Sequence, residues 1–563
     1  MQVELFLLII SLLFFASILT DRIGNRFGVP ALLLFLIVGM VFGPDGFGKW
    51  ISADGMGYIS SISLESMQAI STVALCVILF SGGMDTKLSD IQPVLGPGVT
   101  LATIGVLLTA LFSATLIYFI FGWVQAIASV GFATALLMAA TMSSTDSASV
   151  FSILRTNRIG LKHGLRPLLE LESGANDPMA YVLTITLIGI VTAKTAQPVS
   201  ALTITQEIVV QLIVGAVMGF ALGKAAVALM RKVHLSNESL YPIMILTFCI
   251  FIFAVTYYMR GNSYLAVYMG GLMIGNSKFS RKRQTKSFFD GLTWLCQLMM
   301  FLLLGLMVKP HELMLKEVWL PCLIISFVSI FISRPLSVFL CLAPFKEYQN
   351  RDKLFVSWVG LKGAVPIILS ILCMANNVPH ANLLFNVVFL CTLLTLILQG
   401  STLTRMASSL HLTQEIEEKN ELRYFDIELP EEVEDYAQEM QVTADMLANG
   451  SMLKEMRIPE TIRIIMTRRG ESFFVPSGKT VLKEGDWLLV ISEENMARVQ
   501  QVQAEEEDYA LNEWGMQLIN NTSSFVRDQW NKIRYGSKGE HTTPLGNKPN
   551  EQTTQNTDDK ASV

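Results

Sequence analysis

Apolar stretches long enough to cross a membrane recur through the first 405 residues of this chain. The hydrocarbon core of a bilayer is about 30 Å thick, and a helix needs about 20 mostly apolar residues to span it. About thirteen stretches approach or reach that length, at residues 5–20, 30–43, 67–83, 95–121, 125–150, 167–192, 206–230, 240–258, 262–276, 289–308, 318–343, 354–374 and 381–403. Because lipid offers the backbone no hydrogen-bond partners, we predict an all-α polytopic membrane protein with about thirteen transmembrane helices.

Charged residues are distributed unevenly along the chain. They make up only 16% of the 563 residues, against roughly 25% in an average soluble domain, and they become frequent only after about residue 405. The net charge of −5 argues against nucleic acid as a partner, since nucleic-acid-binding proteins usually present a basic surface. We predict five parts: a transmembrane domain (1–405), an acidic helical linker (406–440), a small α+β regulatory domain (441–503), a docking helix (504–535) and a disordered tail (536–563).

The loops between the predicted spans also differ in charge. Alternate loops carry about 17 Lys and Arg residues and the opposite loops about 5, and cytoplasmic loops hold the excess of positive charge. We therefore expect the N-terminus outside and the charged C-terminal region in the cytoplasm. The first stretch lacks a basic segment and a cleavage site, so we interpret it as a retained span.

Two predicted spans are interrupted by residues that do not favour a helix. The fifth contains the Ser/Thr-rich segment 141–150 with Asp146, and the twelfth contains two glycines, Lys362 and a proline within 360–366. Interrupted helices at matching positions of two inverted repeats indicate the ion site of a transporter. Spans five and twelve are seven apart, which predicts inverted repeats whose two broken helices cross.

Charged and polar residues inside neighbouring spans point to the same place. The sixth span carries Glu172, Asn176 and Asp177, and the eleventh carries Arg334. A charged residue at a helix centre costs about 2.5–3.5 kcal/mol even on the gentler insertion scales, so such residues mark ion pathways or pairs. Ser173 lies four residues before Asp177 on the same helix face. Together with Asp146, these oxygens suit a dehydrated monovalent cation, because hard cations prefer oxygen ligands.

Structural roles compete with this interpretation. Asp177 is alternatively a partner of Arg334 or Lys362, and Asp146 is alternatively a helix cap. We favour Glu172 and Arg334 as an ion pair that holds the site together. Lys362 either neutralises the carbonyl ends of the broken helices or extends to the membrane interface.

These residues resemble the monovalent cation:proton antiporter superfamily, in particular its NhaP branch of bacterial sodium or potassium/proton antiporters. The matching segments are Thr145-Asp146, Glu172-Ser173, Asn176-Asp177, Arg334-Pro335 and Gly360-Leu361-Lys362-Gly363-Ala364. The resemblance covers the membrane region to about residue 405. It implies the NhaA-like antiporter fold, a homodimer in the bacterial inner membrane, and alternating access by a mobile core domain.

The resemblance also implies roles for individual residues. Asp177 is the carrier of proton and cation in turn, with Asp146, Ser173 and the Thr145 carbonyl as co-ligands. This chain departs from the family pattern at the residue after Asp146, where relatives often have a proline and this chain has Ser147.

The supporting residues follow the same resemblance. Glu172 and Arg334 are implied to form the structural pair, Asn176 to brace the site through hydrogen bonds, and Lys362 to supply a positive charge where many relatives have arginine.

One titratable carrier makes proton and cation compete for the same oxygens, which predicts exchange of a cytoplasmic cation for external protons. The neighbouring Asn176 cannot titrate, so we expect an electroneutral one-for-one exchange that serves cation and pH homeostasis. We expect no cofactor beyond the transported K⁺ or Na⁺ and H⁺.

The cytoplasmic residues 441–503 resemble the C-terminal half of the RCK potassium-regulating domain, of the TrkA-C type. Short β-type runs separated by Gly and Pro carry this resemblance, and no glycine-rich dinucleotide fingerprint precedes them. The domain either senses a small-molecule or nucleotide effector or acts as a scaffold for dimerisation and gating, and we favour the scaffold. Its potassium connection favours K⁺ over Na⁺ as the transported cation.

Other classes of function fit less well. A gated cation channel would use rings of carbonyls or charges, and no TVGYG-like filter is present. A transport-inactive membrane sensor would not need Asp146 and Asp177. An intramembrane enzyme is not indicated, because the six histidines are scattered and no HExxH or GxSxG site lies in the spans.

Overall fold

A computed structural model describes residues 8, 11–19, 31–46, 64–123, 130–157, 159–192, 201–233, 235, 237, 239–277, 279, 281–415, 437–447, 450–455, 462–470 and 472–492. The chain divides into two compact units, Met1–Glu417 and Glu418–Val563. The predicted docking helix (504–535) and disordered tail (536–563) lie outside the described residues, as does most of the acidic segment after Glu415.

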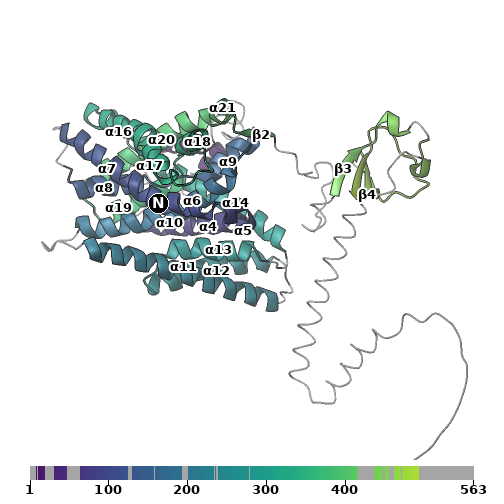
Figure 1. Cartoon of the computed structure of the whole chain (residues 1–563), viewed down its shortest axis with the longest axis horizontal. Helices are drawn as coiled ribbons and strands as arrows, with labels where there is room; N and C mark the ends of the chain where they lie inside the picture. The colour runs from purple at the N-terminus through teal and green to yellow at the C-terminus, as the bar shows by residue number, and fades with distance from the viewer. Residues whose placement is uncertain are drawn as a thin grey trace, which may run out of the picture. The chain divides into compact units, whose positions relative to one another are not determined.

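The first unit is almost entirely helical (Figure 1). Its first half contains α2 (Ala31–Phe42), α4 (Leu64–Asp85), α5 (Leu88–Ile91), α6 (Leu95–Thr100), α7 (Val106–Trp123), α8 (Phe132–Thr141), α9 (Ser147–Thr156), β1 (Ile159–Leu161), α10 (Leu165–Thr192) and α11 (Ala201–Lys232). Its second half contains α12 (Leu240–Tyr258), α13 (Ser263–Gly275), α14 (Lys282–Met307), α15 (Pro310–Leu313), α16 (Lys316–Val328), α17 (Arg334–Cys341), α18 (Asn350–Trp358), α19 (Ala364–Ala375), α20 (Ala381–Thr395), α21 (Ser401–Ser409) and β2 (Thr413–Glu415).

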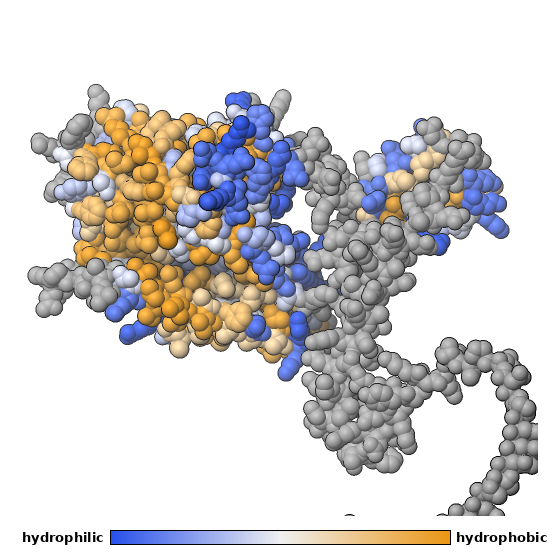
Figure 2. Space-filling view, viewed as in Figure 1, coloured by the Kyte–Doolittle hydropathy of each residue, from blue (hydrophilic) through white to orange (hydrophobic). Residues whose placement is uncertain are grey.

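Eight of the described helices, some of them continuous runs of several elements, are long and apolar enough to cross a membrane. Four shorter apolar helices, α2, α8, α13 and α19, accompany them. Apolar residues cover much of the visible flank of the first unit, whereas hydrophilic residues gather at the end where α9, α18 and α21 lie (Figure 2). This distribution is typical of a protein whose flank faces lipid and whose end faces water.

Three of the helical runs contain a π-helical turn. These turns are Leu101–Gly105 between α6 and α7, Ser329–Ser333 between α16 and α17, and Leu396–Gly400 between α20 and α21. A π turn inserts one extra residue into a helix and frees backbone groups from the regular pattern. The Gly105 carbonyl uses this freedom to accept a hydrogen bond of 2.8 Å from the Ser337 hydroxyl of α17.

Several helices approach so closely that a side chain would not fit between them. A Cβ atom on Gly305 of α14 would lie 2.2 Å from the Leu36 carbonyl oxygen of α2, and one on Gly39 would lie 2.4 Å from the Leu302 oxygen. Small residues permit such backbone contact between membrane helices, where packing rather than hydrophobicity drives association.

The first unit extends beyond residue 405. α21 continues to Ser409, and β2 pairs antiparallel with β1, with Leu161 opposite Thr413. Part of the stretch predicted as a helical linker (406–440) therefore packs within the first unit, and its last residues begin the sheet of the second unit.

The second unit contains an antiparallel four-stranded sheet in the order β3-β6-β4-β5. Its strands are β3 (Ala437–Gln441), β4 (Ile462–Arg469), β5 (Ser472–Phe474) and β6 (Trp487–Ser492). Leu488 and Val490 of β6 are buried on one face of this sheet, and Leu489 and Ile491 on the other. A central strand that is apolar on both faces is expected when both faces of a sheet are covered.

Candidate functional site

The fifth predicted span is a broken helix. α8 ends at Thr141 and α9 begins at Ser147, and Asp146 occupies the N-cap of α9. Its carboxylate accepts hydrogen bonds from the Ser149 backbone N–H at 3.2 Å and from the Ser149 hydroxyl. Asp146 is therefore a helix cap in this conformation, and its negative charge lies at the positive end of the α9 dipole.

The twelfth predicted span is broken as well, between Trp358 of α18 and Ala364 of α19. The two breaks are in contact, because the Asp146 N–H donates to the Leu361 carbonyl at 2.8 Å. A Cβ atom on Gly363 would lie 2.7 Å from both Cβ and Oδ2 of Asp146. Glycine at 363 thus permits the close approach of the two broken helices.

Lys362 lies buried at the same contact. Its Nζ donates to the Ser144 carbonyl at 3.1 Å, and its backbone N–H donates to the Thr395 hydroxyl at 3.3 Å. Two roles were considered for Lys362, and this contact fits the first of them, in which its charge lies against a carbonyl of the broken span. A cation is favourable there because carbonyl oxygens without helical partners collect at the C-terminal side of α8.

Asp177 is buried in the middle of α10 and is 8% exposed. Its Oδ1 accepts a hydrogen bond from the Ser144 hydroxyl. Among the residues that the structure describes, no Lys, Arg or His forms an ion pair with it. In this conformation neither Arg334 nor Lys362 forms a direct ion pair with Asp177, although Lys362 is near enough to interact with its charge.

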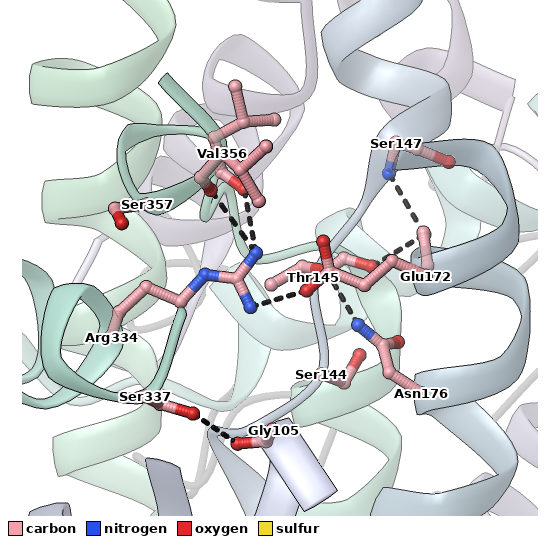
Figure 3. A network of polar contacts seen from close by, with 12 residues as sticks. Gly105, Ser144, Thr145, Ser147, Glu172, Asn176, Arg334, Ser337, Val356 and Ser357 are labelled. Carbon is pink, nitrogen blue, oxygen red and sulfur yellow. Dashed lines mark hydrogen bonds and ion pairs between the residues drawn. The ribbon is translucent and has the colours of Figure 1, made fainter. Parts of the chain in front are cut away.

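Hydrogen bonds from α10 hold the break between α8 and α9 (Figure 3). The Ser173 hydroxyl donates to the Thr145 carbonyl at 2.7 Å and accepts from the Ser147 N–H at 3.0 Å. The Asn176 amide donates to the Thr145 hydroxyl at 2.6 Å. A proline at position 147 would lack the N–H that Ser147 donates to Ser173.

Glu172 and Arg334 form a buried ion pair, with 2.6 Å between Glu172 Oε1 and Arg334 Nη1 (Figure 3). Arg334 Nη2 also donates to the carbonyls of Val356 at 3.4 Å and Val359 at 3.2 Å. One guanidinium therefore links α10, α17 and the C-terminal end of α18 beside the second break.

The predicted site residues divide into two neighbouring groups. A small pocket is lined by Thr145, Asp146, Ser147, Leu169, Glu172, Ser173 and Val359. Asp177 does not line this pocket and instead contacts Ser144. Sequence reasoning missed Ser144, although its position within the hydroxyl-rich interruption was a signal.

Comparison with known proteins places the chain among transporters of one family. The family described as "Sodium/hydrogen exchanger, transmembrane" matches residues 9–409, and the TrkA-C domain matches residues 438–502. The K(+)/H(+) antiporter NhaP of Alkalimonas amylolytica is 36% identical over 498 residues, which cover 86% of this chain and 78% of that protein. The K(+)/H(+) antiporter NhaP2 of Shewanella sp. (strain MR-4) is 35% identical over 511 residues, 88% of this chain and 82% of that protein.

A solved structure shares the fold. The sodium proton antiporter MjNhaP1 from Methanocaldococcus jannaschii, determined at pH 8, superposes with a TM-score of 0.60 at 23% identity. The match covers 72% of this chain and 99% of that chain. With the family match over most of the membrane unit and relatives above 30% identity over most of their length, this chain belongs to the sodium/hydrogen exchanger family.

Proposed function

We propose that this protein exchanges cytoplasmic K⁺ for external protons, one for one, by alternating access. The relatives named K(+)/H(+) antiporter match it over most of their length, including the TrkA-C region. Na⁺ is the second candidate cation, because the Na(+)/H(+) antiporter 1 of Methanocaldococcus jannaschii is 26% identical over 373 residues.

The observation that carries this proposal is the environment of Asp177. A carboxylate at membrane depth that forms no direct ion pair is costly to keep ionised, and the group that bonds directly to Asp177 is a neutral hydroxyl. The free energy of the site therefore falls when either a proton or a cation binds. A proton and a cation can compete only if both of them neutralise the same group.

Exchange is obligatory if the binding site can open to the other side of the membrane only while the Asp177 carboxylate is neutralised by a proton or a cation. The empty, charged carboxylate would have to pass through a low-dielectric environment, which disfavours that step. The neighbouring Asn176 donates to Thr145 and has no titratable proton. One carboxylate then carries one proton or one monovalent cation, and the cycle moves no net charge.

Asp146, Ser173 and the Thr145 carbonyl are the proposed co-ligands of the cation. In this conformation they bond to α9 and to one another. Binding a cation therefore requires that these oxygens exchange internal hydrogen bonds for the ion. Glu172, Arg334, Asn176 and Lys362 keep the surrounding backbone in place while this exchange occurs.

The architecture we propose has thirteen spans with inverted repeats. The helical residues 11–19, the eight long helices and α2 and α13 supply eleven spans. α8 with α9, and α18 with α19, supply the fifth and twelfth as two crossing broken helices. The contact between Asp146 and Leu361, at equivalent points of spans seven apart, supports this assignment.

We further propose a homodimer in the bacterial inner membrane, with the N-terminus outside and the TrkA-C region in the cytoplasm. The excess of Lys and Arg in alternate loops supports this orientation. The TrkA-C region would regulate exchange, either as a dimer scaffold or through a small-molecule or nucleotide effector.

Proton movement in vesicles that contain the purified protein tests the proposed exchange. Imposed K⁺, Na⁺, Rb⁺ and Li⁺ gradients should each be compared, and we expect the strongest coupling with K⁺. Asp177→Asn should abolish cation-coupled proton movement, whereas Asp90→Asn, at an exposed position, should retain it. Coupled proton movement that survives Asp177→Asn would overturn the assignment of the carrier.

A separate measurement tests the one-for-one stoichiometry. With equal cation and proton concentrations on both sides, an imposed membrane voltage should drive no flux. Flux whose direction follows the voltage would show that the cycle carries net charge.

A further inference from the structure

Ser144 occupies a position that connects the two broken spans with the proposed carrier. It lies in the break between α8 and α9 and is 1% exposed. Its hydroxyl donates to Asp177 Oδ1, and its carbonyl accepts from Lys362 Nζ at 3.1 Å. Lys362 of the twelfth span thus fixes the backbone of Ser144, while the side chain of Ser144 faces Asp177 of the sixth.

The other hydroxyl groups near the site have other hydrogen-bond partners. The Ser173 hydroxyl both donates to Thr145 and accepts from Ser147, and the Thr145 hydroxyl accepts from Asn176. The Ser143 hydroxyl, just after α8, donates at 2.7 Å to the Ala140 carbonyl in the last turn of that helix. Within the described part of the chain, Ser144 is the residue whose hydroxyl donates to Asp177.

A serine hydroxyl has one hydrogen to donate and two lone pairs to offer. Towards an empty carboxylate, it donates its hydrogen, as it does here. Towards a cation held by that carboxylate, rotation about the Cβ–Oγ bond turns the hydrogen away and presents a lone pair. No movement of the backbone is needed, because hydroxyl and carboxylate already touch.

We propose that Ser144 is a specificity-determining ligand of the transported cation, which its hydroxyl oxygen coordinates beside Asp177. This inference rests on the proposed function, in which Asp177 carries the cation. The number and field strength of the oxygens around an ion contribute to selectivity among monovalent cations. Removing one neutral oxygen therefore changes both the affinity of the site and its order of preference among cations.

The kinetics of exchange in vesicles distinguish this role from a structural one. We expect Ser144→Ala to raise the KM for K⁺ about tenfold while kcat changes by less than about twofold, since a lost ligand weakens binding. The ratio of the KM values for K⁺, Rb⁺, Na⁺ and Li⁺ should change as well. Ser144→Thr, which keeps the hydroxyl, should remain within a few-fold of the wild-type KM.

Ser143→Ala is the matched control, because it removes a neighbouring hydroxyl that bonds to the last turn of α8 and not to Asp177. We expect it to keep the wild-type KM values. The inference is overturned if Ser144→Ala leaves all four KM values unchanged, or if Ser143→Ala raises them equally. Wild-type protein without cation-coupled proton movement would instead refute the proposed function itself.

A direct binding measurement covers a variant that folds but does not turn over. The thermal stability of the purified full-length protein should rise with added KCl relative to choline chloride, because a ligand that binds the native state stabilises it. The KCl concentration for half of this rise should be about tenfold higher in Ser144→Ala than in wild type. Equal concentrations for both proteins would contradict a coordinating role for Ser144.

Discussion

Glu172 and Arg334 place two opposite charges where neither is solvated. Their side chains are 2% and 9% exposed, and Arg334 also donates to the carbonyls of Val356 and Val359 at the C-terminal end of α18. A buried pair of this kind contributes little net stability against an apolar pair, but the loss of one member leaves an unpaired buried charge. The pair is thus better understood as a constraint on how α10, α17 and α18 fit together than as a source of stability.

Removing one charge of this pair should destabilise the protein strongly. We expect Glu172→Gln to lower the free energy of unfolding by about 3–5 kcal/mol, because Arg334 is left buried without its counter-ion. Glu172→Gln combined with Arg334→Met should recover a large part of that loss. Thermal unfolding of the purified protein in detergent measures both effects.

An exposed pair supplies the control for this comparison. Lys309 and Glu312 lie 3.0 Å apart with side chains 52% and 39% exposed, so Glu312→Gln should cost less than about 1 kcal/mol. If Glu172→Gln costs as little as Glu312→Gln, then the buried pair does not hold the helices together.

At the scale of elements, the site depends on the contact between two broken helices. Gly363 has no side chain where a Cβ atom would overlap Asp146. We expect Gly363→Ala to displace Asp146 and to reduce cation-coupled proton movement by at least about tenfold, because misplacement of about 1 Å is enough for losses of this order. Gly82→Ala in α4 is the matched control, since a Cβ atom there meets open space. Equal activity of the two variants would contradict the inferred contact.

The sequence reveals the breaks themselves, because Ser, Thr, Gly and Pro stand out in otherwise apolar spans. It does not reveal the π turn at Leu101–Gly105, whose residues are those of an ordinary apolar helix. It also does not reveal the bond between Ser144 and Asp177, which joins residues 33 positions apart on different elements. Periodicity reports which residues share a face of one element, whereas such contacts depend on how elements cross.

The short strands were missed for the same reason. β1 and β2 have three residues each, and about 250 residues separate them, so neither shows an alternating pattern long enough to be recognised. Their pairing becomes visible only in the folded chain.

At the scale of the whole molecule, each of the two units has its own core and its own stabilising interactions. The second unit contains a charged interaction at the edge of its small core. The Asp486 side chain is 3% exposed, and its two oxygens accept from Arg469 at 2.9 and 2.6 Å. The Lys483 N–H donates to the same carboxylate at 2.9 Å.

These contacts predict an acid-sensitive sheet. Burial by itself would raise the pKa of Asp486, but the hydrogen bonds from Arg469 and Lys483 outweigh it and hold the pKa below the usual 3.8. A carboxyl with a lowered pKa stabilises the folded state above its unfolded pKa and loses this effect as the pH falls through the folded value. The protection of β4 and β6 against hydrogen exchange should therefore be constant above about pH 5 and should decline below about pH 4.

Asp486→Asn tests the cause of that decline. The variant should lose about 1.5–3 kcal/mol at neutral pH, as expected for hydrogen bonds to a charged group, and its remaining stability should depend less on acid. A decline with the same midpoint in Asp486→Asn would assign the acid sensitivity to other carboxyls.

The chain that leads to the second unit begins at a strand fixed to the broken span. β1 follows α9 closely, β2 pairs with β1, and the Lys162 N–H donates to the Leu412 carbonyl at 3.0 Å. α21, which precedes β2, packs against α9 (Figure 1). The strand pair therefore connects the end of the first unit to α9, whose N-cap is Asp146.

We expect this strand pair to stay intact during transport, because both of its strands continue helices that pack together. Leu161→Cys combined with Thr413→Cys should form a disulfide under mild oxidation, since the two residues lie directly opposite each other and the seven native cysteines are buried. Exchange in vesicles should be the same before and after oxidation, with Leu161→Cys alone as the control. Loss of exchange on oxidation and its recovery on reduction would show instead that the strands separate during the cycle.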